Sequence, residues 1–103
     1  MPVVVVATIS PLPEHREAVR EAVLTAIPQV HEEAGCQRYA LHEGQDARLV
    51  MIEQWESPEA LAAHGKGPAL TELSRALEGK LAGRSDLQVL TAVPAGDDAK
   101  GAI

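Results

Sequence analysis

The densest cluster of polar and aromatic residues contains Glu53 and Trp55 and is followed by His64. Glu53 and Trp55 are two residues apart in a predicted strand, so both side chains point to the same face of the sheet. His64 follows Leu61 by three residues and lies at the edge of the apolar stripe of a predicted helix. If that strand face meets the helix, the three side chains converge. Burial raises the pKa of a carboxyl group, and an imidazole exchanges protons near neutral pH. The cluster therefore predicts proton transfer on a flat apolar substrate.

The histidines and the cysteine show no metal or disulfide pattern. No two of the four histidines stand at the three- or four-residue spacing of ligands on one helix face. The densest glycine segment, Gly65-Lys66-Gly67, lacks the spacing of a nucleotide-binding loop. We therefore expect neither a metal nor a cofactor. Cys36 is the single cysteine. We interpret it as a small apolar residue in a protein of a reducing compartment.

These side chains must be positioned by secondary structure, and the hydrophobic pattern predicts six elements. In order they are strand, helix, strand, strand, helix and strand, at residues 3–9, 13–33, 36–42, 48–55, 58–82 and 86–93. Gly35 should end the first helix, and Ser57 should cap the second, with Pro58 at its first position. Pro28 predicts a kink or a break near residues 25–28, because proline removes a helical hydrogen bond. The segment 65–68 should interrupt the second helix.

The order β-α-β-β-α-β is typical of a ferredoxin-like α+β fold, an antiparallel sheet with helices on one face. The first strand is apolar on both faces, and in the third strand Val50 and Ile52 point away from Met51 and Trp55. Two helices cover only one face, so the other would expose a large apolar surface. This patterning predicts a homodimer packed sheet against sheet. Residues 1–93 form the predicted domain, and 94–103 a tail that is mobile or docked on a partner.

The charge balance excludes some classes of partner. The chain has 103 residues, with 9 Lys and Arg against 15 Asp and Glu, a net charge of −6. Nucleic acids and anionic membranes bind basic surfaces, so we expect neither as a partner. The longest apolar run, Val3–Ala7, is too short to span a membrane, and no basic segment precedes it. We therefore expect no signal peptide and a cytoplasmic location.

At these positions the sequence resembles the antibiotic biosynthesis monooxygenase family, and within it the small cofactor-free quinol monooxygenases. The resemblance spans residues 3–93 and is carried by Glu33–Cys36 followed by Tyr39, by Met51–Ser57 and by Glu59–His64. It implies a dimeric α+β barrel with a pocket between the sheet and the helices. It also implies oxidation of a quinol or polyphenol-like aromatic by O₂ without flavin or metal.

The resemblance assigns catalytic roles to His64 and Glu53. His64 is expected to accept a proton from a bound quinol, and Glu53 to orient or tune the imidazole. The alternative for His64 is a hydrogen-bonded histidine at the edge of the core. The alternative for Glu53 is a structural hydrogen bond or an ion pair with Arg38 or Arg48.

Substrate binding is assigned to Trp55 and Tyr39. Trp55 is expected to form a flat wall of the pocket, and its alternative is the largest side chain of the core. The hydroxyl of Tyr39 is expected to hold a quinol oxygen. Its alternative is an aromatic residue at the dimer interface.

Three kinds of function remain open from the sequence. The first is a cofactor-independent monooxygenase acting on a quinol or polyphenol. The second is a related enzyme with the same fold, an isomerase or a haem-degrading protein. Haem-degrading members of this superfamily resemble one another in a pattern of Asn, Trp and His. This chain contains no Asn, so the haem-degrading branch is disfavoured. The third is a non-catalytic dimeric module that binds a small aromatic ligand, which a fold alone does not exclude.

Overall fold

The computed structural model of the chain describes residues 1–103. Seven regular elements and one short 3₁₀ helix form in the predicted order, with the second predicted helix divided in two. The strands are β1 (Val3–Ile9), β2 (Cys36–Glu43), β3 (Leu49–Trp55) and β4 (Asp86–Leu90). The helices are η1 (Pro13–His15), α1 (Arg16–His31), α2 (Pro58–Gly65) and α3 (Pro68–Leu77).

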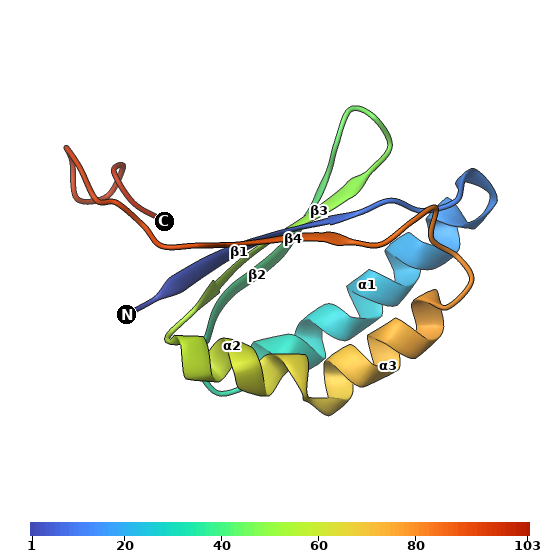
Figure 1. Cartoon of the computed structure of the whole chain (residues 1–103), viewed down its shortest axis with the longest axis horizontal. Helices are drawn as coiled ribbons and strands as arrows, with labels where there is room; N and C mark the ends of the chain where they lie inside the picture. Colours follow the sequence, from blue (N-terminus) through green and yellow to red (C-terminus); the bar gives the residue numbers. More distant parts are fainter.

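The four strands form one antiparallel sheet in the order β2-β3-β1-β4. The three α-helices lie together on one side of this sheet, and no element covers the other side (Figure 1). This is the predicted ferredoxin-like α+β fold. No helix is both long enough and apolar enough to cross a membrane.

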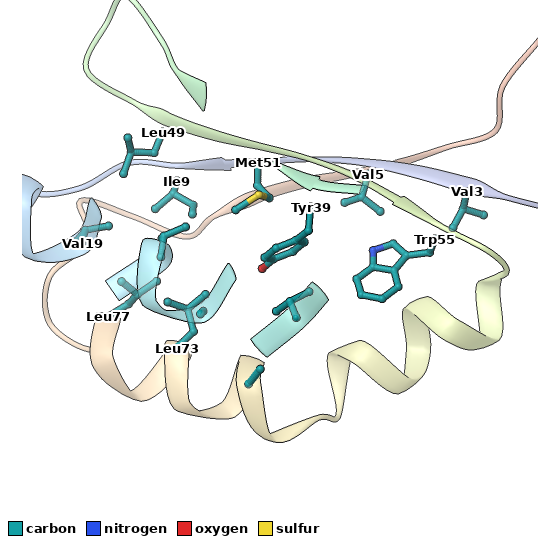
Figure 2. Close-up of a cluster of buried hydrophobic side chains, with 14 residues drawn as sticks. Val3, Val5, Ile9, Val19, Tyr39, Leu49, Met51, Trp55, Leu73 and Leu77 are labelled. Atoms are coloured by element: carbon teal, nitrogen blue, oxygen red, sulfur yellow. The ribbon is translucent and has the colours of Figure 1, made fainter. Parts of the chain in front are cut away.

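The core lies between the sheet and the helices. Along β3, burial alternates residue by residue: Met51, Glu53 and Trp55 are buried, whereas Val50 and Ile52 are only partly covered. The two faces of this strand are therefore assigned as predicted. A cluster of 14 buried apolar residues fills the layer between sheet and helices, and Figure 2 shows the rings of Tyr39 and Trp55 within it.

Two helix predictions need correction. The first helix does not break at Pro28, because α1 continues unbroken to His31. Pro28 lies in the last turn and removes only one hydrogen bond, while Val23, Ala26 and Val30 hold the helix in the core. The last helix was expected to reach Ala82, but α3 ends at Leu77.

The early end of α3 has a local cause. Gly79 has a φ of 77°, which interrupts helical geometry two residues after Leu77. The chain then turns back to the segment after β1, where Leu81 forms an isolated antiparallel bridge with Pro11. The apolar spacing of Leu81 therefore reflects packing against the sheet end and not a further helical turn.

The last strand is shorter than predicted, ending at Leu90 instead of Val93. Val4 of β1 is the last partner, opposite Leu90, and β1 itself starts at Val3. Strand β4 therefore ends where β1 no longer offers residues to pair with. Several large apolar side chains along this end of the chain are exposed: Leu87, Val89, Leu90 and Val93. The tail beyond them extends away from the domain (Figure 1).

Candidate active site

A cavity of about 380 Å³ lies between the sheet and the helices. Most of its walls are aliphatic. Its polar groups come from Tyr39, Glu53, His64, Ser74 and Ser85. Three of the four site residues predicted from the sequence therefore line one cavity, although they come from β2, β3 and α2. An apolar chamber with a few convergent polar groups is the usual form of a small-molecule site.

The rings of the predicted residues form one cluster. The imidazole of His64 lies 4.5 Å from the ring of Trp55 and 5.4 Å from that of Tyr39, measured between ring centroids. Tyr39 and Trp55 meet edge to face at 6.4 Å. The expected convergence of Trp55 and His64 is thus present, and Tyr39 joins them. Such ring contacts restrict the orientation of the imidazole.

Trp55 occupies a different place from the one expected. It has no exposed surface and is not among the residues that line the cavity. Its indole lies beneath the imidazole of His64, tilted by 30°. Trp55 therefore contacts His64 and does not itself line the cavity.

The carboxyl group of Glu53 forms the structural hydrogen bond that was the alternative to a catalytic role, and its partner is Trp55. The indole N–H donates to Oε1 of Glu53 at 2.9 Å, and the carboxyl group is buried. The alternative ion pairs are wrong, because Arg38 donates to Gln54 and Arg48 to Asp46. Burial raises the pKa of Glu53, while the Trp55 hydrogen bond and the charge of His64 act in the opposite direction. This carboxyl group therefore holds a proton more readily than an exposed one.

Tyr39 faces the helices with only 5% of its surface exposed. In the predicted dimer the interface is the opposite face of the sheet, so this position does not fit the alternative of an interface aromatic. Burial raises the pKa of its phenol far above the ordinary value, and the charges of Glu53 and Glu33 add to the effect. The hydroxyl consequently stays protonated and can donate a hydrogen bond to an oxygen in the cavity.

His64 is held near the end of α2 and is 6% exposed. The helix begins as predicted, because Ser57 Oγ accepts from the backbone N–H of Ala60 at 3.1 Å and Pro58 takes the first position. The Nδ1 atom of His64 lies 2.8 Å from Oε1 of Glu33. This carboxylate, and not that of Glu53, is therefore the hydrogen-bond partner of the imidazole.

The Glu33–His64 pair was not predicted. Glu33 belongs to the segment that carries the family resemblance, yet it is 31 residues from His64 and no local pattern joins them. Gly35 gives the nearest signal. It adopts a φ of 83°, and a Cβ there would lie 2.5 Å from Cβ of Ala60 in α2. Glycine thus allows the turn after α1 to approach α2 closely, which places Glu33 beside His64.

No group of three or more His, Cys, Asp or Glu side chains is arranged to hold a metal ion. The chemistry available to the protein's own side chains is acid–base chemistry. An imidazole, a protonated phenol and a carboxyl group with a raised pKa adjoin one largely apolar space. Such a set can remove a proton from a hydroxyl group and stabilise the resulting oxyanion.

The chain is similar to several known proteins in sequence and in fold. The "Probable quinol monooxygenase YgiN" of Escherichia coli strain K12 is 35% identical over an alignment of 75 residues, with 63% of this chain and 72% of that protein covered. The solved structure of Rv0793 from Mycobacterium tuberculosis superposes with a TM-score of 0.87 at 28% identity, covering 94% of this chain and 100% of that one. PA3566 from Pseudomonas aeruginosa superposes with a TM-score of 0.82 at 30% identity, covering 89% and 94%.

The sequence also matches a family model described as antibiotic biosynthesis monooxygenase, over residues 2–76. That span runs from β1 to all but the last residue of α3 and includes Glu33, Tyr39, Glu53, Trp55 and His64. The family match and the relatives support a monooxygenase type of function. By sequence and by fold, the chain belongs to the antibiotic biosynthesis monooxygenase family.

Proposed function

We propose that the protein is a cofactor-independent monooxygenase that oxidises a quinol or polyphenol-like aromatic with O₂. The observation that carries the proposal is the cavity of about 380 Å³, in which His64, Tyr39 and Glu53 adjoin mostly aliphatic walls. A flat aromatic ring suits such walls, and its hydroxyl groups require partners of this kind. The name of the Escherichia coli relative points to the same substrate class.

The proposed reaction is quinol + O₂ → hydroxyquinone + H₂O, in which the substrate supplies all the electrons. Nε2 of His64 removes a proton from one hydroxyl, and the Tyr39 hydroxyl donates a hydrogen bond to the resulting oxyanion. The electron-rich ring transfers one electron to O₂, and the two radicals combine to form a C–O bond. The hydrogen at that ring carbon moves as a proton to the outer peroxide oxygen, and the C–H electron pair forms a carbonyl as the O–O bond breaks and hydroxide leaves. The departing hydroxide takes a proton from the imidazolium and leaves as water.

Glu53 and Trp55 support this chemistry through the imidazole. The negative charge of Glu53 interacts with His64, and Trp55 stacks against its ring. Glu53 also fixes the indole through the 2.9 Å hydrogen bond to Trp55. In this arrangement both residues act on the substrate mainly through His64.

Oxygen isotope labelling tests the reaction directly. Menadiol and ¹⁸O₂ are mixed with the purified protein after treatment with a chelator, and the rate is compared with protein-free oxidation. Monooxygenation places one ¹⁸O atom in the hydroxylated quinone and the other in water. Accelerated formation of unlabelled menadione with hydrogen peroxide would mean simple oxidation and contradict the proposal. A thermal shift with quinol but no turnover across a panel of reduced quinones would favour a binding module instead.

We also propose that two copies pack through the uncovered face of the sheet. Val6, Val50 and Ile52 lie on that face and are only partly covered, next to exposed Leu90 of β4. A contiguous apolar surface of this kind on one face of a sheet is typical of an interface between subunits. Such a dimer leaves the helix-covered cavity of each copy intact.

A further inference from the structure

The imidazole of His64 separates two cavities. The inner one is the candidate substrate chamber, and the outer one is a groove of about 390 Å³ next to α2 and the start of α3. His64 lines both, whereas Glu33 lines the outer groove only. Glu33 therefore reaches the imidazole from the side away from the substrate chamber.

The hydrogen bond between them determines which nitrogen carries the proton. An ionised carboxylate only accepts, so the Nδ1 atom that lies 2.8 Å from Oε1 of Glu33 must be the donor. A neutral imidazole protonated at Nδ1 has a bare Nε2, and that nitrogen is the one that can act as a base. Nε2 of His64 has no hydrogen-bond partner within the protein.

We propose that Glu33 is the positioning residue of the site: it fixes the Nδ1–H tautomer of His64, so that Nε2 is left free for the substrate, and it balances the imidazolium that forms. The catalytic part of this inference rests on the proposed function. The proton that Nε2 receives from the quinol stays on the imidazolium, beside Glu33, until the hydroxide takes it.

The charges around His64 agree with this role. The ionisable groups that face it are Glu53 from β3, Tyr39 from β2, and Glu33 with Glu32 and Glu72 around the outer groove. Neither cavity is lined by a lysine or an arginine. A positive charge on the imidazole therefore meets only carboxylates or neutral groups, and the nearest carboxylate already holds its N–H.

The second oxygen of Glu33 is a further sign of function. Oε2 is buried and has no hydrogen-bond donor. A carboxylate oxygen without a donor from the protein is stabilised by a positive charge nearby. The charge that could compensate this oxygen is the one that His64 acquires when it accepts a proton.

The tautomer can be observed without any substrate. In ¹⁵N-labelled protein the ring nitrogens of His64, assigned by the loss of its signals in His64→Gln, report which nitrogen bears hydrogen at a pH where the ring is neutral. We expect Nδ1–H in the wild type. Glu33→Ala should restore Nε2–H, the form favoured in water, whereas Glu33→Gln should retain Nδ1–H because its amide oxygen also accepts.

Kinetics with menadiol then separate the effect of the Glu33 hydrogen bond on the orientation of His64 from the effect of the Glu33 charge. Glu33→Gln should lower kcat by about 10- to 100-fold with KM unchanged, because Glu33 does not line the substrate chamber. The acid limb of its pH–rate profile should move to lower pH, because the imidazolium has lost its counter-charge. Glu32→Gln is the matched control: it removes the same charge from the same groove, and Glu32 makes no hydrogen bond to His64.

An Nε2–H tautomer in the wild type, or an Nδ1–H tautomer that survives in a folded Glu33→Ala protein, would overturn the inference. So would a Glu33→Gln enzyme with wild-type kcat and pH profile. Absence of turnover with every quinol in the wild type would overturn the proposed function alone, and the NMR result would still decide whether Glu33 sets the tautomer.

Discussion

The two faces of the sheet differ in what they require from the rest of the protein. The helix-covered face contains polar side chains that need particular partners, such as Glu53 with the indole N–H and His64 with Glu33. The uncovered face presents Val50 and Ile52, which need only another apolar surface. Successive residues of β3 therefore serve different purposes, and substitutions one position apart should damage different properties: catalysis and core packing on one face, assembly on the other.

The largest effect is expected at the covered face, where His64→Ala removes the proposed base. Loss of a general base lowers rates by about 10²- to 10⁴-fold, and alanine is well tolerated in a helix. We expect that loss in kcat with menadiol, in a protein that still folds. His42→Ala is the control, because His42 is exposed and its strand position faces the other side. A His64→Ala enzyme with wild-type kcat from pH 5 to 9 would show that His64 is not the base. The quinol would then ionise spontaneously in the cavity.

Trp55→Ala should show the largest loss of stability. The indole has no exposed surface, and removing a buried aromatic ring costs about 3–5 kcal/mol. Urea unfolding measures this loss. Gln54→Ala, one position away on the open face, should change the free energy of unfolding by less than about 1 kcal/mol. Equal losses at both positions would mean that the two faces are equally packed.

Ile52→Lys tests the uncovered face. If a second copy covers this face, the new charge is buried without a partner, which should cost more than about 1 kcal/mol and dissociate the dimer. Sedimentation should show about twice the 10.9 kDa chain mass for the wild type and the monomer mass for this variant. Ala76→Lys adds the same charge at an exposed position of α3. A wild-type protein that sediments as a monomer, or a dimeric Ile52→Lys variant, would contradict the proposed interface.

Glu53→Gln should change the free energy of unfolding least among these variants, and the size of the change should depend on pH. The pKa of Glu53 is raised from its ordinary value of 4.5 by burial, so the folded protein binds this proton more tightly than the unfolded chain. The stabilisation that this bound proton gives to the folded state is therefore fully present below pH 4.5. It is lost as pH rises through the folded-state pKa of Glu53.

Urea unfolding of both proteins from pH 4 to pH 8 measures the difference. The wild type should lose stability relative to Glu53→Gln as pH rises, because the amide oxygen still accepts from Trp55 but carries no charge. A difference in stability that does not vary with pH would show that burial does not disfavour the ionised form of Glu53.

Element order and face assignment could be predicted because they depend on local pattern. The alternation of β3 and the Ser57-Pro58 start of α2 are properties of neighbouring residues, and the structure confirms both. One error arose where packing overrides a local signal, and the other where Gly79 interrupts the helix. Pro28 is accommodated within α1 by the packing of that helix, and Leu81 pairs with Pro11 instead of extending α3.

The sequence by itself determined the fold class, the family and the candidate residues Tyr39, Glu53 and His64, because periodicity and short motifs are local information. Only the tertiary structure decided which carboxylate forms a hydrogen bond with which partner. Glu33 meets His64 across 31 residues, and Glu53 binds the indole N–H of Trp55. A hydrogen bond requires its two atoms within about 3 Å, and that precision comes from how the turn after α1 packs against α2.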